Sequence, residues 1–131
     1  MTKIDEFTRH IQDKDRYELY IYEQLVDADP DFVDALFPMA ELYTQVGQYK
    51  KGLEVDIRLA RLYPDDSSVI YNLACSYSLC AKPQQSLDAL EKAVSLGFDD
   101  IEHIESDEDL HNIRNQPRYA VLIANLRNKS I

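Results

Sequence analysis

The sequence predicts an all-α fold in which pairs of helices repeat along the chain. Residues 31–64 and 65–98 carry similar side chains at positions 34 residues apart. The matched pairs are Leu36 and Ile70, Met39 and Leu73, Ala40 and Ala74, Tyr43 and Tyr77, Leu53 and Leu87, and Leu62 and Leu96. A turn signal divides each copy into two helix-length segments, Gly47 in the first and Pro83 in the second. Together these observations favour antiparallel helix pairs and no sheet.

The chain opens with a segment that predicts an incomplete leading repeat over residues 2–30. Apolar residues at helical spacing predict a short amphipathic helix over residues 2–12. A second helix is expected to begin at Asp15, whose carboxylate can accept hydrogen bonds from the first free amides. That helix is expected to end before Pro30, because the residue that precedes a proline avoids the α conformation.

The first full copy, residues 31–64, predicts one helix near 33–46 and a second near 49–62. Gly47 lies between them and suits the left-handed conformation common just beyond a helix end. Pro38 falls inside the first of these helices, where it removes one backbone hydrogen bond. We therefore expect Pro38 to bend that helix or to delay its start.

Small residues recur where the two helices of each copy should cross. Ala40 and Gly52 hold these two sites in the first copy, and Ala74 and Ser86 hold them in the second. The period and these small residues resemble the tetratricopeptide repeat (TPR) family. The resemblance implies a right-handed α-solenoid of helix-turn-helix repeats. Residues 65–98 resemble the family most closely, whereas in the first copy Asp56 stands where the family usually has a large apolar residue.

The last third of the chain predicts a charged connection followed by a cap. Seven of the eleven residues in 99–109 are acidic, which predicts a solvated loop or a very short helix. Ser106 and Asp109 have the spacing of a capping box, and Pro117 suits the start of a final helix. Residues 110–131 resemble tails that follow TPR arrays in bacterial proteins, which implies a C-terminal cap and a bacterial origin. We therefore predict a single domain over residues 1–131.

Composition and charge narrow the possible partners and the location. The formal net charge of −10 argues against binding to nucleic acid or to anionic membranes. No apolar run approaches the roughly 20 residues needed to span a bilayer, and no secretory signal is visible in residues 1–12. Cys75 and Cys80 are expected to remain reduced, because five residues apart on one helix they cannot form a disulfide. We expect a cytoplasmic protein.

Candidate chemistry is sparse, and we expect no catalytic residues, no cofactor and no metal. Residues 27–31 alternate aspartates as at the start of an EF-hand, but Phe32 occupies the required glycine position. His103, Asp107 and His111 could present a metal-binding face on a helix, although a solvated cluster fits the acidic stretch better. No phosphate-binding loop or nucleophile motif is present. The sequence therefore favours a binding protein over an enzyme.

The resemblance implies a concave groove formed by the first helix of each repeat. Its expected residues are Phe37, Glu41, Thr44, Tyr71, Cys75 and Ser78. The leading repeat would continue this surface with Lys3, Phe7 and His10. The aromatic residues and the acidic charge favour a peptide or helix of another protein with flanking Lys or Arg. An alternative is that the chain's own C-terminal segment or a second copy fills the groove.

These observations predict a protein–protein interaction module, an adaptor or assembly factor that binds its partner in the groove. One alternative is a small TPR chaperone of a bacterial secretion system. The other is a regulatory fragment of a larger enzyme or receptor. The oligomeric state stays open.

Overall fold

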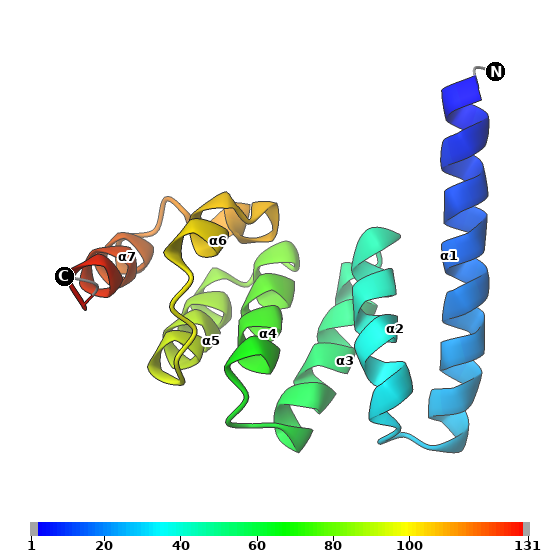
Figure 1. Ribbon diagram of the computed structural model, residues 1–131, viewed down its shortest axis with the longest axis horizontal. Helices are drawn as coiled ribbons and strands as arrows, with labels where there is room; N and C mark the ends of the chain where they lie inside the picture. Colours follow the sequence, from blue (N-terminus) through cyan, green and yellow to red (C-terminus); the bar gives the residue numbers. More distant parts are fainter. Residues whose placement is uncertain (1–2, 130–131) are drawn as a thin grey trace. The chain divides into compact units, whose positions relative to one another are not determined.

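The computed structural model describes the backbone of residues 3–129 and the side chains from residue 13 to residue 129 (Figure 1). This part of the chain contains helices and no strand. The elements are α1 (Lys3–Ala28), α2 (Val33–Gln45), α3 (Tyr49–Leu62), α4 (Ser67–Leu79), α5 (Pro83–Ser95), α6 (Ile101–Ser106), the 3-10 helix η1 (Glu108–Ile113) and α7 (Pro117–Lys129). Across the described stretch, no helix combines the length and the apolar character needed to cross a bilayer. The helix pairs α2–α3 and α4–α5 match the two predicted copies.

The chain divides into two compact units, Met1–Val55 (unit 1) and Asp56–Ile131 (unit 2). The boundary falls within α3. Unit 1 therefore comprises α1, α2 and the first half of α3. Unit 2 comprises the rest of α3 and all the later helices.

In unit 1, α1 is one continuous helix of 26 residues, so the predicted division near Asp15 is wrong. No glycine or proline lies between residues 3 and 28, and nothing else in that stretch breaks a helix. Lys14 instead pairs with Glu18 one turn further on, at 3.9 Å, which supports the helix across the predicted gap. The segment predicted to form a leading helix pair is therefore a single long helix.

The helix α1 packs against α2 through a narrow apolar face. Leu19 and Val26, two turns apart, are both buried. Tyr43 of α2 is buried as well, and its hydroxyl donates a hydrogen bond to the carboxylate of Glu23 at 2.9 Å. Burial, followed by this bond to Glu23, raises the pKa of the Tyr43 phenol. Tyr43 is thus a packing residue between α1 and α2.

Pro38 neither ends nor delays α2, because the helix begins at Val33 and continues to Gln45. The turn that follows depends on Gly47, which has a φ of +80°. A Cβ at that position would meet nothing within 4 Å, so the backbone conformation rather than space calls for glycine. At Gly52 a neighbouring helix lies close, because a Cβ there would be in ordinary van der Waals contact with the Cβ of Tyr43, at 3.5 Å.

Unit 2 contains the second helix pair and repeats the turn with different residues. Ala81 takes the left-handed conformation, with a φ of 58°, at the position that corresponds to Gly47. The amide of Lys82 bonds the carbonyl of Tyr77 at 2.9 Å, and Pro83 then opens α5. A non-glycine residue is thus held in this conformation by the closed turn around it.

The crossing of α4 and α5 is tight and polar at one point. Ser86 and Ala74 are both fully buried, and the Ser86 hydroxyl donates to the Ala74 carbonyl at 2.7 Å. This bond satisfies the buried hydroxyl and takes up the second hydrogen-bonding site of a helical carbonyl. The sequence-based prediction of small residues at this crossing is confirmed.

Replacing Ala74 with Leu is expected to lower the free energy of unfolding by about 1–3 kcal/mol, because the added atoms overpack this crossing. Urea denaturation followed by circular dichroism measures the change. Ala120→Leu on α7 is the matched control, because Ala120 is exposed and should change stability by less than about 0.5 kcal/mol. Equal stability of the wild type and Ala74→Leu would show that the two helices are not in close contact at this site.

The acidic stretch 99–109 forms a very short helix, which was one of the two predicted alternatives, and Ile104 within it belongs to the core of unit 2. It forms α6 and the start of η1, and Ile104 is fully buried. Leu110 and Ile113, which follow in η1, are also fully buried. The acidic residues fall mostly between these apolar positions and face outward. The alternative of a solvated loop is wrong, because the buried side chains of these three aliphatic residues anchor the two short helices to the core.

The cap for the start of η1 also differs from the predicted one. Asp107, rather than Ser106, is the N-cap residue, and its side chain accepts from the amide of Asp109 at 3.0 Å. The final helix, α7, begins at Pro117 as predicted. Its buried face consists of Tyr119, Ile123 and Leu126, which belong to the unit 2 core.

Candidate binding face

The six predicted groove residues lie in different units, and the two groups have opposite exposures. In unit 1, Phe37 is 41% exposed, Glu41 is exposed and Thr44 is half-buried. The Thr44 hydroxyl donates to the carbonyl of Ala40 at 3.3 Å. These residues recur at helical spacing on α2, and we call them the α2 face. The side chains of Lys3, Phe7 and His10 lie outside the described residues.

In unit 2, the other three predicted groove residues are buried. Tyr71, Cys75 and Ser78 are 3%, 7% and 0% exposed. The covering residues come from the chain's own segment 98–113, which packs over α4. A partner therefore has no access to these three side chains in this arrangement. Within unit 2 the chain itself therefore fills the predicted groove, with segment 98–113, of which only residues 110–113 belong to the predicted C-terminal cap.

Tyr71 is a core residue and not, as the sequence predicted, an aromatic residue of an open groove. Its ring stacks on that of Phe98, with centroids 4.1 Å apart and planes within 5° of parallel. The ring of His103 lies at a tilt 5.4 Å away. No sequence signal indicated this, because the contacts join α4 to residues about thirty positions further along the chain.

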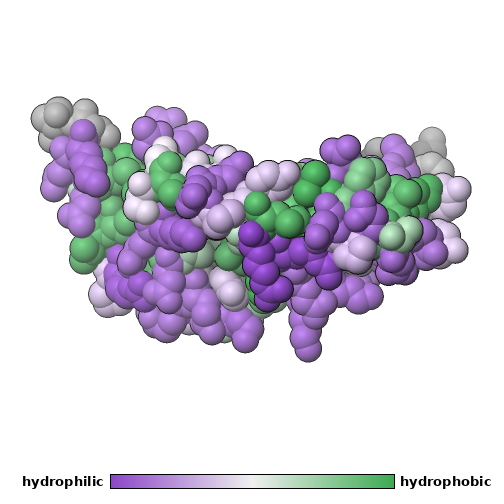
Figure 2. All heavy atoms as spheres, turned by 90° about the horizontal axis from the view of Figure 1, so that it is seen from below, coloured by the Kyte–Doolittle hydropathy of each residue, from purple (hydrophilic) through white to green (hydrophobic). Residues whose placement is uncertain are grey.

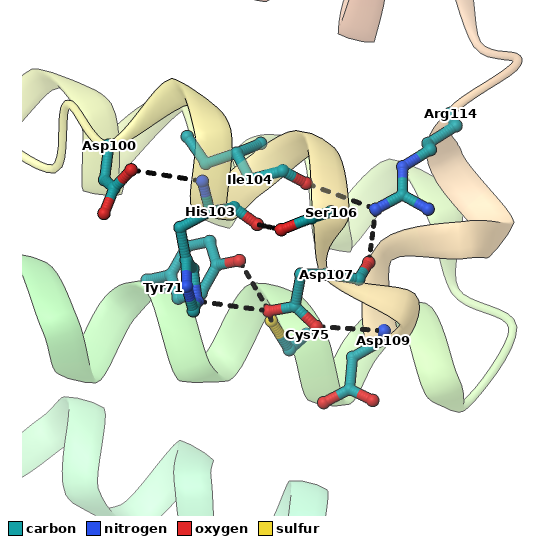
Figure 3. A network of polar contacts seen from close by, with 9 residues as sticks. All are labelled: Tyr71, Cys75, Asp100, His103, Ile104, Ser106, Asp107, Asp109 and Arg114. Carbon is teal, nitrogen blue, oxygen red and sulfur yellow. Dashed lines mark hydrogen bonds and ion pairs between the residues drawn. The ribbon is translucent and has the colours of Figure 1, made fainter.

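Asp107 is the polar centre that ties the covering segment to α4 (Figure 3). Its Oδ2 accepts a hydrogen bond from the Tyr71 hydroxyl at 2.7 Å and a weaker one from Cys75 Sγ at 3.7 Å. The same oxygen lies 3.5 Å from Nε2 of His103, one turn earlier in the chain. The guanidinium of Arg114 donates to the backbone carbonyl of Asp107 and, at 3.3 Å, to that of Ile104. Bonds from three segments thus converge on one residue.

These surroundings keep both α4 groups protonated. Burial raises the pKa of the Tyr71 phenol, and the neighbouring Cys75 and Asp107 raise it further. Burial likewise raises the pKa of the Cys75 thiol, with added effects from Asp107 and Asp109. A thiol that stays protonated is a poor nucleophile, so Cys75 is a packing residue. Neither Cys75 nor Cys80 forms a disulfide.

One group of possible metal ligands lies in the same place. Donor atoms of Cys75, Asp107 and Asp109 all lie within 4.8 Å of one another. Burial and the nearby charge of Asp107 raise the pKa of the Asp109 carboxyl. The thiol of Cys75 donates to Asp107, whose carboxylate also accepts from the backbone amide of Asp109. Two of the three donor groups, the thiol of Cys75 and the carboxylate of Asp107, thus take part in hydrogen bonds within the fold.

A second surface, between α5 and α7, was not predicted. It is a hollow of about 520 Å³ with an apolar floor, and Figure 2 shows apolar surface in the region of α7. We call it the α5–α7 groove; its main lining residues are Val94, Arg118, Val121, Leu122, Leu126 and Lys129. The one feature of the sequence that could have indicated this groove is Val121, an apolar residue outside the face on which α7 packs.

Arg118 fixes α7 alongside α5 at one end of this groove. Its guanidinium donates to Asp88 at 2.7 Å, to Glu91 at 2.8 Å and to Gln84 at 3.0 Å. The hydrogen bonds to Asp88 and Glu91 raise the pKa of Arg118, which stays charged. Arg127, further along α7, pairs with Glu105 of α6. The contacts of Arg118 therefore hold α7 alongside α5 at the groove, and Val121 at its edge is 59% exposed.

Comparisons of the sequence with known proteins found a partial relative. No family model matches the chain. A stretch of 84 residues is 33% identical to a chloroplastic protein of Arabidopsis thaliana, covering 62% of this chain and 25% of that protein. The chain thus spans about a quarter of the length of this curated relative.

Among solved structures, the chain resembles a MamA RS-1 ArsTM double mutant. The TM-score is 0.65 at 16% sequence identity, and the match covers 89% of this chain and 68% of that one. MamA is a TPR-containing protein. The fold is therefore all-α and TPR-like, as the sequence predicted. At this level of identity the likeness extends to the fold alone.

Proposed function

We propose that this chain is a protein-interaction module, an adaptor or assembly factor, that binds a peptide or helix of another protein on the α2 face. The observation that carries the proposal is the exposure of Phe37, at 41%, beside the exposed carboxylate of Glu41. An exposed aromatic ring supplies binding energy when a partner covers it. TPR-like helix pairs offer such a helix face as a surface for other chains.

Charge specifies the kind of partner. The chain has a net charge of −10, and the α2 face itself contains Glu41. A partner segment with Lys or Arg would be attracted to this acidic chain at long range. An apolar residue between those charges would contact the ring of Phe37. The proposed role is binding, and Cys75, a buried thiol whose pKa is raised by burial and acidic neighbours, is not a candidate nucleophile in it.

The test uses peptides selected on the immobilised protein from a random library. The tightest peptide is then titrated by fluorescence anisotropy against the wild type and Phe37→Ala. We expect Phe37→Ala to weaken binding by about 1–3 kcal/mol, because it removes an aromatic anchor. Added salt should slow association more than it speeds dissociation.

Tyr49→Ala is the matched control, because Tyr49 is also an aromatic residue of unit 1 and is 40% exposed. It should bind the peptide as the wild type does. If Tyr49→Ala weakened binding and Phe37→Ala did not, the α2 face would not be the site.

A further inference from the structure

Two exposed carboxylates lie on either side of Phe37 along α2. Asp34 is three residues before the aromatic residue and Glu41 is four residues after it, and both are exposed. Residues spaced by three and four lie on one face of a helix, and seven residues rise by about 10 Å. Asp34 therefore extends the α2 face by one turn, so the exposed ring of Phe37 lies between two acidic side chains.

These two carboxylates have no opposite charge beside them in the part of the chain whose side chains are described. Between residues 13 and 129, no hydrogen bond or ion pair engages the carboxylate of Asp34 or of Glu41. The helix α2 itself contains no Lys or Arg. On α5, by contrast, the exposed carboxylate of Glu91 pairs with Arg118 of α7 at 2.8 Å. The α2 face thus presents two negative charges that a partner can neutralise.

The two carboxylates differ in what they contribute to the helix. Asp34 lies in the first turn of α2, where the helix dipole favours a negative charge. Glu41 lies in the middle of the helix, beyond the reach of the dipole at either end. The helix therefore gains little from the charge of Glu41, and this residue is the sharper test of a role in binding.

The spacing of these side chains favours a helix as the partner. The row on α2 has intervals of three, four and three residues, and its members are Asp34, Phe37, Glu41 and Thr44. This is the spacing of the seam between two packed helices. A partner helix rises by the same amount per residue, about 1.5 Å, so its own side chains stay level with the row. An extended strand rises by roughly 3.3 Å per residue and loses that match within a few residues.

A second copy of this chain does not offer the side chains that would complement the row. Two pairs of basic residues lie seven positions apart in the sequence: Arg9 with Arg16, and Lys51 with Arg58. The positions between the first pair that would face Phe37 hold the polar residues Gln12 and Asp13. Between the second pair, the apolar residue at the required position is Val55, which is buried. The complementary helix therefore belongs to another protein.

We propose that the α2 face binds an amphipathic helix of another protein that has two Lys or Arg residues seven positions apart and an apolar residue between them. The two basic residues pair with Asp34 and Glu41, and the apolar residue covers the ring of Phe37. The charge pairs set the register of the two helices, and burial of the ring supplies affinity. This assignment rests on the proposed function and adds the secondary structure and the spacing of the partner segment.

The test is a charge exchange with the tightest selected peptide whose binding depends on Phe37. Glu41→Lys should weaken its binding in fluorescence anisotropy by about tenfold or more, because a basic residue of the peptide then meets a like charge. Each Lys and Arg of the peptide is then replaced with Glu in turn. One of these replacements should weaken binding to the wild type and restore binding to Glu41→Lys.

Glu54→Lys is the matched control for the change in net charge, because Glu54 is an exposed acidic residue of unit 1 that lies on α3. It should weaken binding of the same peptide by less than about threefold at about 0.15 M salt, where charges distant from the peptide are screened. Circular dichroism of the mixture, after subtraction of the separate spectra, should show that the peptide gains helix when it binds.

The outcomes separate this proposal from the proposed function. Far-ultraviolet circular dichroism checks that Glu41→Lys is folded, and Glu41→Gln, with a smaller expected loss, replaces it if it is not. If no selected peptide depended on Phe37, the proposed function and the helical partner would both be wrong. If a Phe37-dependent peptide bound Glu41→Lys as well as it binds Glu54→Lys, or gained no helix, the helical basic partner alone would be wrong.

Discussion

Replacing Ile104 with Ala is expected to lower the free energy of unfolding by about 2–5 kcal/mol. Ile104 lies in the most acidic stretch of the chain, yet it is fully buried in the core of unit 2. Truncating its side chain removes buried methyl groups and leaves a cavity beneath α6. Urea denaturation followed by circular dichroism measures the loss. Ile101→Ala is the matched control, because Ile101 is on the same helix but is only half-buried, so its loss should be smaller.

The result also shows whether the face of α4 that contains Tyr71 and Cys75 is covered in solution. The sequence analysis had assigned that face to a partner. A large loss means that segment 98–113 is part of the folded core and that Tyr71 and Cys75 stay covered. A loss of less than about 0.5 kcal/mol, typical of surface sites, would mean that the segment is detached in solution. Tyr71 and Cys75 would then be accessible to a partner, as the sequence-based interpretation had it.

The helix pairs could be predicted because their signals are local or repeated. Gly47 and Pro83 mark turns by their own backbone chemistry. The small residues Gly52 and Ser86 mark helix crossings because the facing helix lies close, and a Cβ at Gly52 would already be in van der Waals contact with the Cβ of Tyr43, at 3.5 Å. The repeat adds strength to each signal, since a site seen in one copy can be checked in the other.

The covered face could not be predicted, because the repeat register says which side of a helix faces inward and not what lies on it. Tyr71 occupies the same kind of position as Phe37, yet one is 3% exposed and the other 41%. The difference comes from Phe98 and Asp107, which lie outside the second copy's helices. Contacts between residues about thirty positions apart leave no periodic pattern in a sequence.

Asp56 is another departure from the family pattern that the structure explains. It is 6% exposed, and its carboxylate accepts a hydrogen bond from the hydroxyl of Ser76, which is also buried. Burial raises the pKa of Asp56 from 3.8 to about 6, although the bond from Ser76 acts in the opposite direction. A charged carboxylate is costly in a site that the family fills with an apolar side chain. The fold therefore favours the protonated form of Asp56.

The sign of the resulting pH dependence follows from the raised pKa. Below pH 3.8, Asp56 is protonated in both the folded and the unfolded chain, so its ionisation does not lower the free energy of unfolding. As the pH rises toward 6, the unfolded chain ionises first, so the contribution of Asp56 to stability falls, and above pH 6 the loss is complete. The gap between the two pKa values corresponds to about 3 kcal/mol at neutral pH.

Replacing Asp56 with Asn should therefore stabilise the protein increasingly as the pH rises from 4 to 7, by up to about 3 kcal/mol. The amide oxygen of Asn can still accept the bond from Ser76, so the change removes mainly the charge. Urea denaturation of both proteins at several pH values gives the difference in free energy, in which the titration of the other carboxylates cancels. Asp65→Asn, at an exposed aspartate, should show no such trend. A difference between Asp56→Asn and the wild type that stays constant with pH would mean that Asp56 is ionised in the folded chain at no cost, with its charge satisfied by Ser76.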